Sequence, residues 1–178
     1  MSEDNFERSL KFVLKVEGGF THDAADSGGA TNLGITQSEY DRDRKRRALM
    51  QQSVFCISAD EAHAIYLKDY WIKGKCDLMQ WPVCLAHFDA CVNTGILQAG
   101  KFLQRACGAT VDGVVGPMTL QKLEEDIEVS GEHLVASRVA GSRAAFYRAL
   151  VDKKPSQGVF LRGWLNRLGD LTEEMKNV

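Results

Sequence analysis

Apolar side chains recur every three or four residues near the start of the chain. Over residues 3–17, Phe6, Leu10 and Val13 fall on one face of a helical projection. This spacing predicts an amphipathic helix. Gly18 follows directly, and glycine often ends a helix because it adopts the left-handed conformation without strain. The helix is therefore expected to stop at this point.

The rest of the chain predicts further helices through their start and stop signals. Residues 36–39 (TQSE) and 58–61 (SADE) are capping boxes, and the second is expected to start a helix running to about Trp71. The apolar run 85–92 predicts a central buried helix that breaks at Gly95. Gly116-Pro117 places proline at a first helical position. The remaining predicted helices span residues 97–106, 132–151 and 160–174.

A glycine-rich segment separates the first two predicted helices. Residues 18–35 combine the turn formers DSGG with a short extended stretch, TNLGI. Such a segment is typical of a small hairpin or a compact loop. The sequence thus predicts a mainly helical fold with a central buried helix and one small β element.

Composition excludes several classes of protein. The 178 residues are 44% hydrophobic and 26% charged with a net charge of −2, as in ordinary globular domains, and this balance favours no nucleic acid partner. No run approaches the roughly 20 apolar residues that span a bilayer, so no stable membrane association is expected. The acidic start, MSEDNFERSLKF, lacks the features of a signal peptide.

Cysteine, histidine and the basic run give no sign of a metal or cofactor. The five cysteines include no CxxC pair, so they are interpreted as reduced core thiols rather than a disulfide framework or a zinc site. The four histidines show no metal-ligand spacing, and we expect no cofactor. The run RDRKRR, residues 42–47, is interpreted as a solvated helix face rather than a nucleic acid site.

Glu17 is the first candidate for chemistry. It continues the apolar stripe of the first helix and ends that helix at the negative end of its dipole, where a carboxylate is disfavoured by about 0.3–1 kcal/mol. Desolvation and the dipole both favour the protonated carboxyl group and raise its pKa. A neutral acid of this kind suits general acid catalysis. The alternative is a solvated acidic residue at a helix end.

A second carboxylate would complete a glycosidase pair. Asp26 is the preferred partner and Asp23 the alternative, because both follow Glu17 in the glycine-rich segment; a turn role is open for each. Two carboxyl groups about 6.5–9.5 Å apart indicate an inverting reaction, and about 5 Å indicates a covalent intermediate. The sequence leaves both mechanisms open.

These residues belong to blocks that resemble a known family. The block EGGF, residues 17–20, and the block DSGGATNLGIT, residues 26–36, resemble the opening of glycoside hydrolase family 108, bacterial and phage N-acetylmuramidases. The resemblance continues through FDACVNTG, residues 88–95, VDGVVGPMT, residues 111–119, and GWLNR, residues 163–167. It therefore covers nearly the whole chain in the expected order.

The resemblance implies a lysozyme-like α+β fold, a helical bundle around a central buried helix with a small β hairpin beside the active cleft. It also implies a reaction and a set of residues. Glu17 corresponds to the catalytic acid of that family, and the trio Glu17, Asp26 and Thr31 is similar to that of phage-type lysozymes, except that the threonine is one residue closer. The implied reaction is hydrolysis of the β-1,4 bond from N-acetylmuramic acid to N-acetylglucosamine in peptidoglycan. Residues 1–95 would form the catalytic lobe, and residues 96–178 a helical peptidoglycan-binding-type lobe packed with it.

Aromatic and amide side chains are the candidates for sugar contacts. They are Phe20, Asn32, Tyr66, Tyr70 and Asn93. Flat aromatic faces and hydroxyl groups suit sugar binding, but core packing explains the tyrosines equally well, and a cap or turn role explains Asn93.

Two other functions stay open. One is a module that binds peptidoglycan glycan strands without cutting them, and the other is a chitinase-type activity. Without a visible signal peptide, the expected route for a cytoplasmically made protein is release through a holin pore, as for a prophage endolysin, or a dedicated export system.

Overall fold

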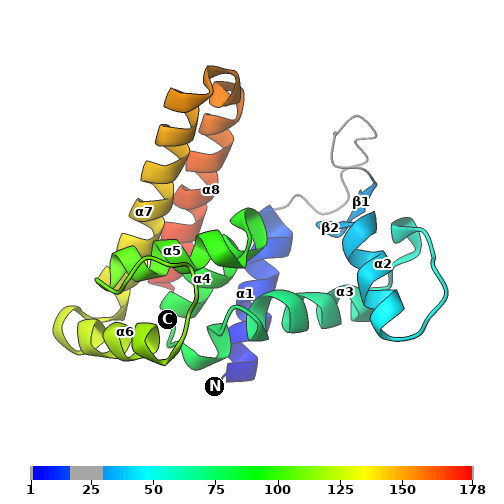
Figure 1. Ribbon diagram of the computed structural model, residues 1–178, viewed down its shortest axis with the longest axis horizontal. Helices are drawn as coiled ribbons and strands as arrows, with labels where there is room; N and C mark the ends of the chain where they lie inside the picture. Colours follow the sequence, from blue (N-terminus) through cyan, green and yellow to red (C-terminus); the bar gives the residue numbers. More distant parts are fainter. Residues whose placement is uncertain (1, 17–29, 178) are drawn as a thin grey trace.

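The computed structural model describes residues 2–16 and 30–177. Its described part is mainly helical, with one two-stranded sheet (Figure 1). The elements in chain order are α1 (Ser2–Val16), β1 (Thr31–Asn32), β2 (Ile35–Thr36), α2 (Gln37–Arg46), η1 (Val54–Cys56), α3 (Ala59–Ile65), η2 (Tyr66–Ile72), η3 (Cys76–Leu78), α4 (Val83–Thr94), α5 (Ile96–Ala106), α6 (Pro117–Ser130), α7 (Glu132–Lys153), η4 (Pro155–Gln157) and α8 (Gly158–Lys176). This confirms the predicted fold class.

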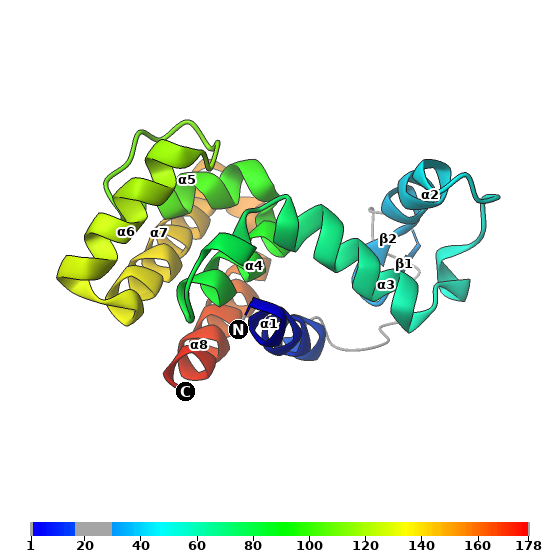
Figure 2. The ribbon, with the colours of Figure 1, turned by 90° about the horizontal axis from the view of Figure 1, so that it is seen from below.

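Helix α4 is the centre of the molecule. Every residue from Val83 to Cys91 is buried, as the apolar run 85–92 predicted. Helices α1, α5 and α7 pack against it, and α7 and α8 run side by side as a long hairpin (Figures 1 and 2). The elements α2, α3 and the β hairpin lie at the other end of the molecule (Figure 2). Helix α4 breaks at Gly95, whose φ of +80° suits glycine.

Local capping signals place most helix starts correctly. Thr36 and Ser58 each form the predicted capping box, with Glu39 and Glu61 as the reciprocal partners. Helix α6 begins with Pro117 at its first position. In α1, the stripe residue Phe6 is buried as predicted, together with Leu10 and Val13. None of the described helices combines the length and apolar character needed to cross a bilayer.

One predicted helix differs in its winding. The α-helix expected from residue 58 to about Trp71 ends at Ile65, and Tyr66–Ile72 continues as a π-helix. A π-helix adds a residue to each turn and so changes which side chains face the core. Tyr66 and Trp71 are both buried and pack around Phe88 of α4. The π-helical winding thus coincides with the segment whose aromatic side chains pack on α4, a tertiary contact that helical periodicity alone does not predict.

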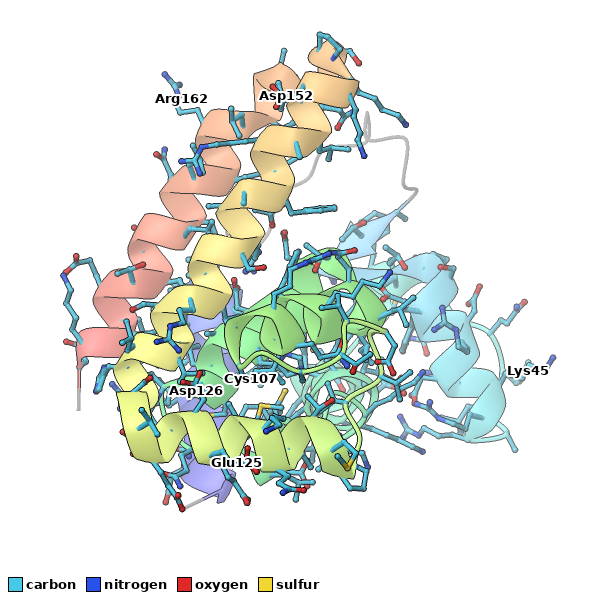
Figure 3. The ribbon with its side chains drawn as sticks, turned by 60° about the vertical axis from the view of Figure 1, so that its left-hand side comes forward. Lys45, Cys107, Glu125, Asp126, Asp152 and Arg162 are labelled. Atoms are coloured by element: carbon cyan, nitrogen blue, oxygen red, sulfur yellow. The ribbon has the colours of Figure 1, made fainter. Side chains whose placement is uncertain are left out.

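The basic run of residues 42–47 forms a paired helix face. Arg44 bonds Glu61, and Arg46 bonds both Asp43 and Asp69. Lys45 points away from the molecule at the end of α2 (Figure 3). The predicted solvated face is therefore also tied to α3 and η2 by ion pairs.

The turn before α6 packs tightly on α5. The buried amide of Gln104 accepts a hydrogen bond from the backbone of Gly113 and donates one to Asp112, both at 2.7 Å. A Cβ atom added at Gly100 would lie 2.3 Å from the Gly113 carbonyl oxygen. The absence of a side chain at Gly100 is therefore what allows this turn to approach the helix.

We expect Gly100→Ala to lower the free energy of unfolding by about 1–3 kcal/mol, the usual cost of overpacking. Gly141→Ala is the matched control, because its added Cβ meets nothing within 4 Å and alanine favours the helix by about 0.5–1 kcal/mol. Urea unfolding of both variants measures the difference. Equal stability of the two variants would contradict the close approach seen at Gly100.

Candidate active site

The β hairpin presents the first candidate site residues. Thr31 pairs with Thr36 and Asn32 with Ile35, and the turn between them, Leu33-Gly34, has positive φ at both positions. Two-residue turns of this kind match the right-handed twist of a hairpin. Residues 18–29 of the predicted 18–35 segment lie outside the described residues. Thr31 is exposed on its first strand.

Tertiary hydrogen bonds made by Tyr66 and Asn32 fix the hairpin in place. The Tyr66 hydroxyl donates to the Leu33 carbonyl oxygen at 2.9 Å, and the Asn32 amide donates to the Val54 carbonyl oxygen at 3.3 Å. Tyr66 is fully buried, whereas Asn32 is half-buried. Both side chains thus position the hairpin, and the face of the Tyr66 ring is packed in the core.

Tyr70 lies at a small pocket between α2, η2 and the start of α5. The pocket has a volume of about 290 Å³, and its polar lining includes Glu39, Arg42, Asp69, Tyr70 and Lys73. The Tyr70 hydroxyl donates a short hydrogen bond to Glu39. Burial, followed by this bond, raises the pKa of Tyr70. Tyr70 therefore stays a neutral hydrogen-bonding group at any physiological pH.

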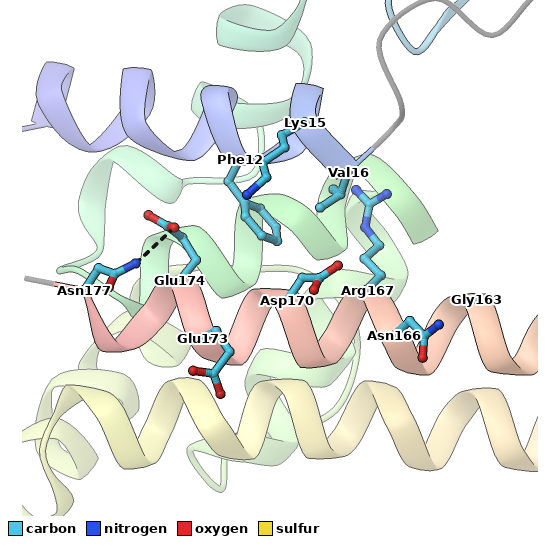
Figure 4. Close-up of a pocket in the computed structure, with 10 residues that line it drawn as sticks. All are labelled: Phe12, Lys15, Val16, Gly163, Asn166, Arg167, Asp170, Glu173, Glu174 and Asn177. Atoms are coloured by element: carbon cyan, nitrogen blue, oxygen red, sulfur yellow. Dashed lines mark hydrogen bonds between the residues drawn. The ribbon is translucent and has the colours of Figure 1, made fainter.

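A second pocket of about 560 Å³ lies between α1 and α8 (Figure 4). Its lining is mixed in charge, with Lys15 and Val16 from the end of α1 and Asn166, Arg167 and Asp170 from α8. Val16 is the residue that precedes Glu17 in the chain. Polar groups of both charge types and a flanking Phe12 can bind a ligand that carries hydroxyl, amide and carboxylate groups.

Asn93 is exposed near the end of α4, and its carboxamide is held by a network beneath it. The Asn93 Oδ1 atom accepts a hydrogen bond from the Tyr147 hydroxyl, which itself accepts one from Arg143 Nε at 2.7 Å. Tyr147 also stacks on Trp164 of α8, with ring centroids 4.8 Å apart. The hydrogen bond from Tyr147 thus orients the Asn93 side chain, which remains exposed to solvent.

The same network contains a buried charge cluster that the sequence did not predict. Asp89 is fully buried and accepts hydrogen bonds from Arg143 and from Arg167, the latter at 2.6 Å. These arginines follow Asp89 by 54 and 78 residues. Because Arg167 also lines the α1–α8 pocket, Asp89 fixes a guanidinium group at the pocket wall.

Glu17, Phe20 and Asp26, together with the alternative carboxylate Asp23, lie outside the described residues. Among the described candidates, Asn32 and Tyr66 converge on the hairpin, Tyr70 lines the pocket beside Glu39, and Asn93 ends the central helix. The roles of these residues therefore stay predictions.

The structure also brings together Cys76, His87 and Cys91. The sequence analysis interpreted the two cysteines as core thiols and found no metal-ligand spacing around the histidine. All three are buried. Burial raises the pKa of the Cys76 thiol, whereas a hydrogen bond from Cys76 lowers the pKa of Cys91. All five cysteines are free, and four of them are buried as the interpretation as core thiols predicted, whereas Cys56 is exposed. Their convergence depends on tertiary packing, because Cys76 is 11 residues from His87 along the chain.

Comparison with known proteins agrees with the resemblance noted in the sequence. Residues 10–95 match the family described as Glycosyl hydrolase 108, and residues 98–169 match the family described as "Predicted Peptidoglycan domain". No curated protein matches the chain. Among solved structures, that of Brucella abortus SagA has a TM-score of 0.79 and 25% sequence identity, over 97% of this chain and 94% of that chain. The chain therefore carries a glycosyl hydrolase 108 domain followed by a peptidoglycan domain.

Proposed function

We propose that this protein hydrolyses the β-1,4 bond between N-acetylmuramic acid and N-acetylglucosamine in bacterial peptidoglycan. The observation that carries the proposal is the pairing of a glycosyl hydrolase 108 match with a peptidoglycan domain match in one chain. The first supplies a glycoside hydrolase, and the second indicates which polymer it meets. Muramic acid carries a carboxylate or a peptide at its lactyl group, and the mixed-charge pockets suit such a ligand.

Glu17 is the proposed general acid. It protonates the oxygen of the leaving sugar, while Asp26 supports attack at the anomeric carbon and Thr31 helps to position water. Thr31 is exposed on β1, and the Tyr66 hydroxyl holds the adjoining turn at Leu33. A fixed strand end gives a water-positioning hydroxyl the geometric precision that acid–base chemistry requires.

Phe20, Asn32, Tyr70 and Asn93 are the proposed sugar contacts, and Tyr66 supports them from the core. Tyr70 and Asn93 each have a defined internal partner, Glu39 and Tyr147, which leaves their outer faces pre-oriented for a ligand. Pre-orientation of polar side chains lowers the entropic cost of binding a sugar.

The proposed roles of the two lobes follow from the two family matches. Residues 1–95 form the catalytic lobe and residues 96–178 the peptidoglycan-binding lobe. The two regions are packed as one unit, because α4 of the first contacts α5, α7 and α8 of the second. Made in the cytoplasm, the enzyme acts on the cell wall after release through a holin pore, as a prophage endolysin would, or through an export system.

Clearing of a cell-wall zymogram tests this function against a binding module and a chitinase. The proposal expects clearing of peptidoglycan and little or no release of sugars from chitin. Sedimentation with cell walls in the absence of clearing would overturn the enzymatic proposal in favour of a binding module. Preferential release of sugars from chitin would overturn the assignment of the substrate.

Asp26→Asn is expected to reduce peptidoglycan turnover by at least about 10²-fold, because an amide cannot act as a base or nucleophile. Asp23→Asn is the matched control in the same segment and should retain activity close to that of the wild type. The rate of turbidity loss with purified cell walls measures both. The reverse order of effects would assign the second carboxylate to Asp23.

A further inference from the structure

Two cysteines and a histidine meet in the core beneath the π-helical segment. Cys76 comes from η3, whereas His87 and Cys91 lie one turn apart on α4. Each side chain is completely buried. The two sulfur atoms and a ring nitrogen of His87 lie within 4.8 Å of one another, and the distance from Cys91 Sγ to His87 Nε2 is 3.6 Å.

The backbone around the cluster leaves room for the sulfur atoms. A Cβ atom at Gly74 would lie 2.9 Å from Cys91 Sγ and 3.3 Å from Cys76 Sγ, so only glycine fits there without displacement. The Gly74 carbonyl oxygen lies 3.0 Å from His87 Nε2. Gly74 therefore contributes an oxygen atom to the same small volume.

The histidine is not fully satisfied by this packing. His87 Nδ1 is buried without a hydrogen-bond partner in the described part of the chain. The other ring nitrogen, Nε2, is the atom that faces the cluster, 3.6 Å from Cys91 Sγ and 3.0 Å from the Gly74 carbonyl oxygen. A core that required only small apolar residues would not need an imidazole at this position.

We propose that Cys76, His87 and Cys91 bind a zinc ion, with the Gly74 carbonyl oxygen in the fourth position. Two sulfur ligands and one nitrogen ligand suit a borderline-soft ion such as Zn²⁺ and disfavour Mg²⁺ and Ca²⁺, which prefer oxygen. With bonds of about 2.3 Å to sulfur and 2.0 Å to nitrogen, tetrahedral angles separate these ligands by about 3.5 Å. The 3.6 Å between Cys91 and His87 agrees with that geometry.

Charge balance also favours this ion. Binding releases one proton from each thiol, and the resulting two thiolates neutralise the two positive charges of the ion. A neutral assembly can be buried, whereas an uncompensated charge in the core is strongly unfavourable. None of the three residues lines either described pocket, so the proposed ion has a structural role. It would link η3 to α4 and thereby support the neighbouring η2 segment, which carries Tyr70.

Metal content of the full chain tests this site. The protein is treated with a chelator, incubated with zinc chloride under reducing conditions and passed through gel filtration. We expect about one zinc ion per chain for the wild type and less than about a tenth of that for Cys76→Ala and Cys91→Ala. Cys84→Ala is the matched control, because Cys84 is a buried thiol of the same helix outside the cluster. It should retain the full amount.

X-ray absorption of the zinc-loaded wild type provides a readout that requires no variant to fold. The proposal expects two sulfur neighbours and two nitrogen or oxygen neighbours around the zinc ion. It would be overturned if the wild type retained no stoichiometric zinc or if Cys84→Ala lost as much as Cys91→Ala. Detection of a disulfide between Cys76 and Cys91 in protein purified without reductant would also overturn it.

Discussion

Glu17→Gln is expected to reduce peptidoglycan turnover to about one per cent of the wild-type rate or less, because general acid–base catalysis contributes about 10²–10⁴-fold. Glutamine has nearly the same shape but no proton of suitable pKa to give to the leaving oxygen. The substitution leaves the buried stripe of α1, Phe6, Leu10 and Val13, unchanged. The variant should therefore keep the circular dichroism spectrum and melting temperature of the wild type.

Glu7→Gln is the matched control for this prediction. Glu7 is an exposed glutamate on the same helix, where it contacts His63. Its substitution should leave the rate of turbidity loss unchanged. A Glu17→Gln protein that retained more than a few per cent of the wild-type rate would remove Glu17 as the catalytic acid, whatever the control shows.

Asp89→Asn is expected to have the largest effect on stability, a loss of about 3–5 kcal/mol in the free energy of unfolding. Arg143 and Arg167 both donate to the buried Asp89 carboxylate, and Arg143 is itself only 1% exposed. An asparagine leaves the two guanidinium groups without a compensating negative charge. The cost of an unpaired buried charge is much larger than that of a lost surface contact.

Glu125→Gln provides the comparison for Asp89→Asn. Glu125 pairs with Lys122 on the surface of α6, where both side chains are about half exposed (Figure 3). Water screens this pair, so its removal should leave urea unfolding within experimental error of the wild type. If Asp89→Asn were no less stable than Glu125→Gln, the buried cluster would not be what holds α4 to α7 and α8.

Helix starts and ends that depend on residues close together in the chain could be predicted from the sequence. The capping boxes at Thr36 and Ser58, the proline at the start of α6 and the break at Gly95 all depend on contacts within a few residues. The buried helix α4 follows from its continuous apolar run. In each case the signal and the structure lie in the same short segment.

Features that depend on distant partners could not be predicted. The π-helical winding of Tyr66–Ile72 coincides with packing of Trp71 against Phe88, and the hydrogen bond from the Tyr66 hydroxyl to Leu33 links this segment to the hairpin. The Asp89 cluster joins residues 54 and 78 positions apart. A buried aspartate in an apolar run was the one available signal, because such a charge requires a partner.

In the candidate site, the sequence identified polar and aromatic side chains but did not predict which residues they contact. Tyr66 has the expected hydroxyl group, but it supports the hairpin from the core. Asn93 was expected either in the cleft or at a helix end, and the structure places it at the exposed end of α4 with Tyr147 as its partner. Neither partner is visible from spacing, because each comes from another part of the chain.

The bond that is cut is the central claim, and identification of the new reducing ends tests it most directly. Purified peptidoglycan is digested with the wild type and with Glu17→Gln, and the products are reduced with borohydride, hydrolysed and analysed. Reduced muramic acid in the wild-type digest, and its absence from the variant digest, is the predicted result. Reduced glucosamine in place of reduced muramic acid, or equal products from both proteins, would contradict the account.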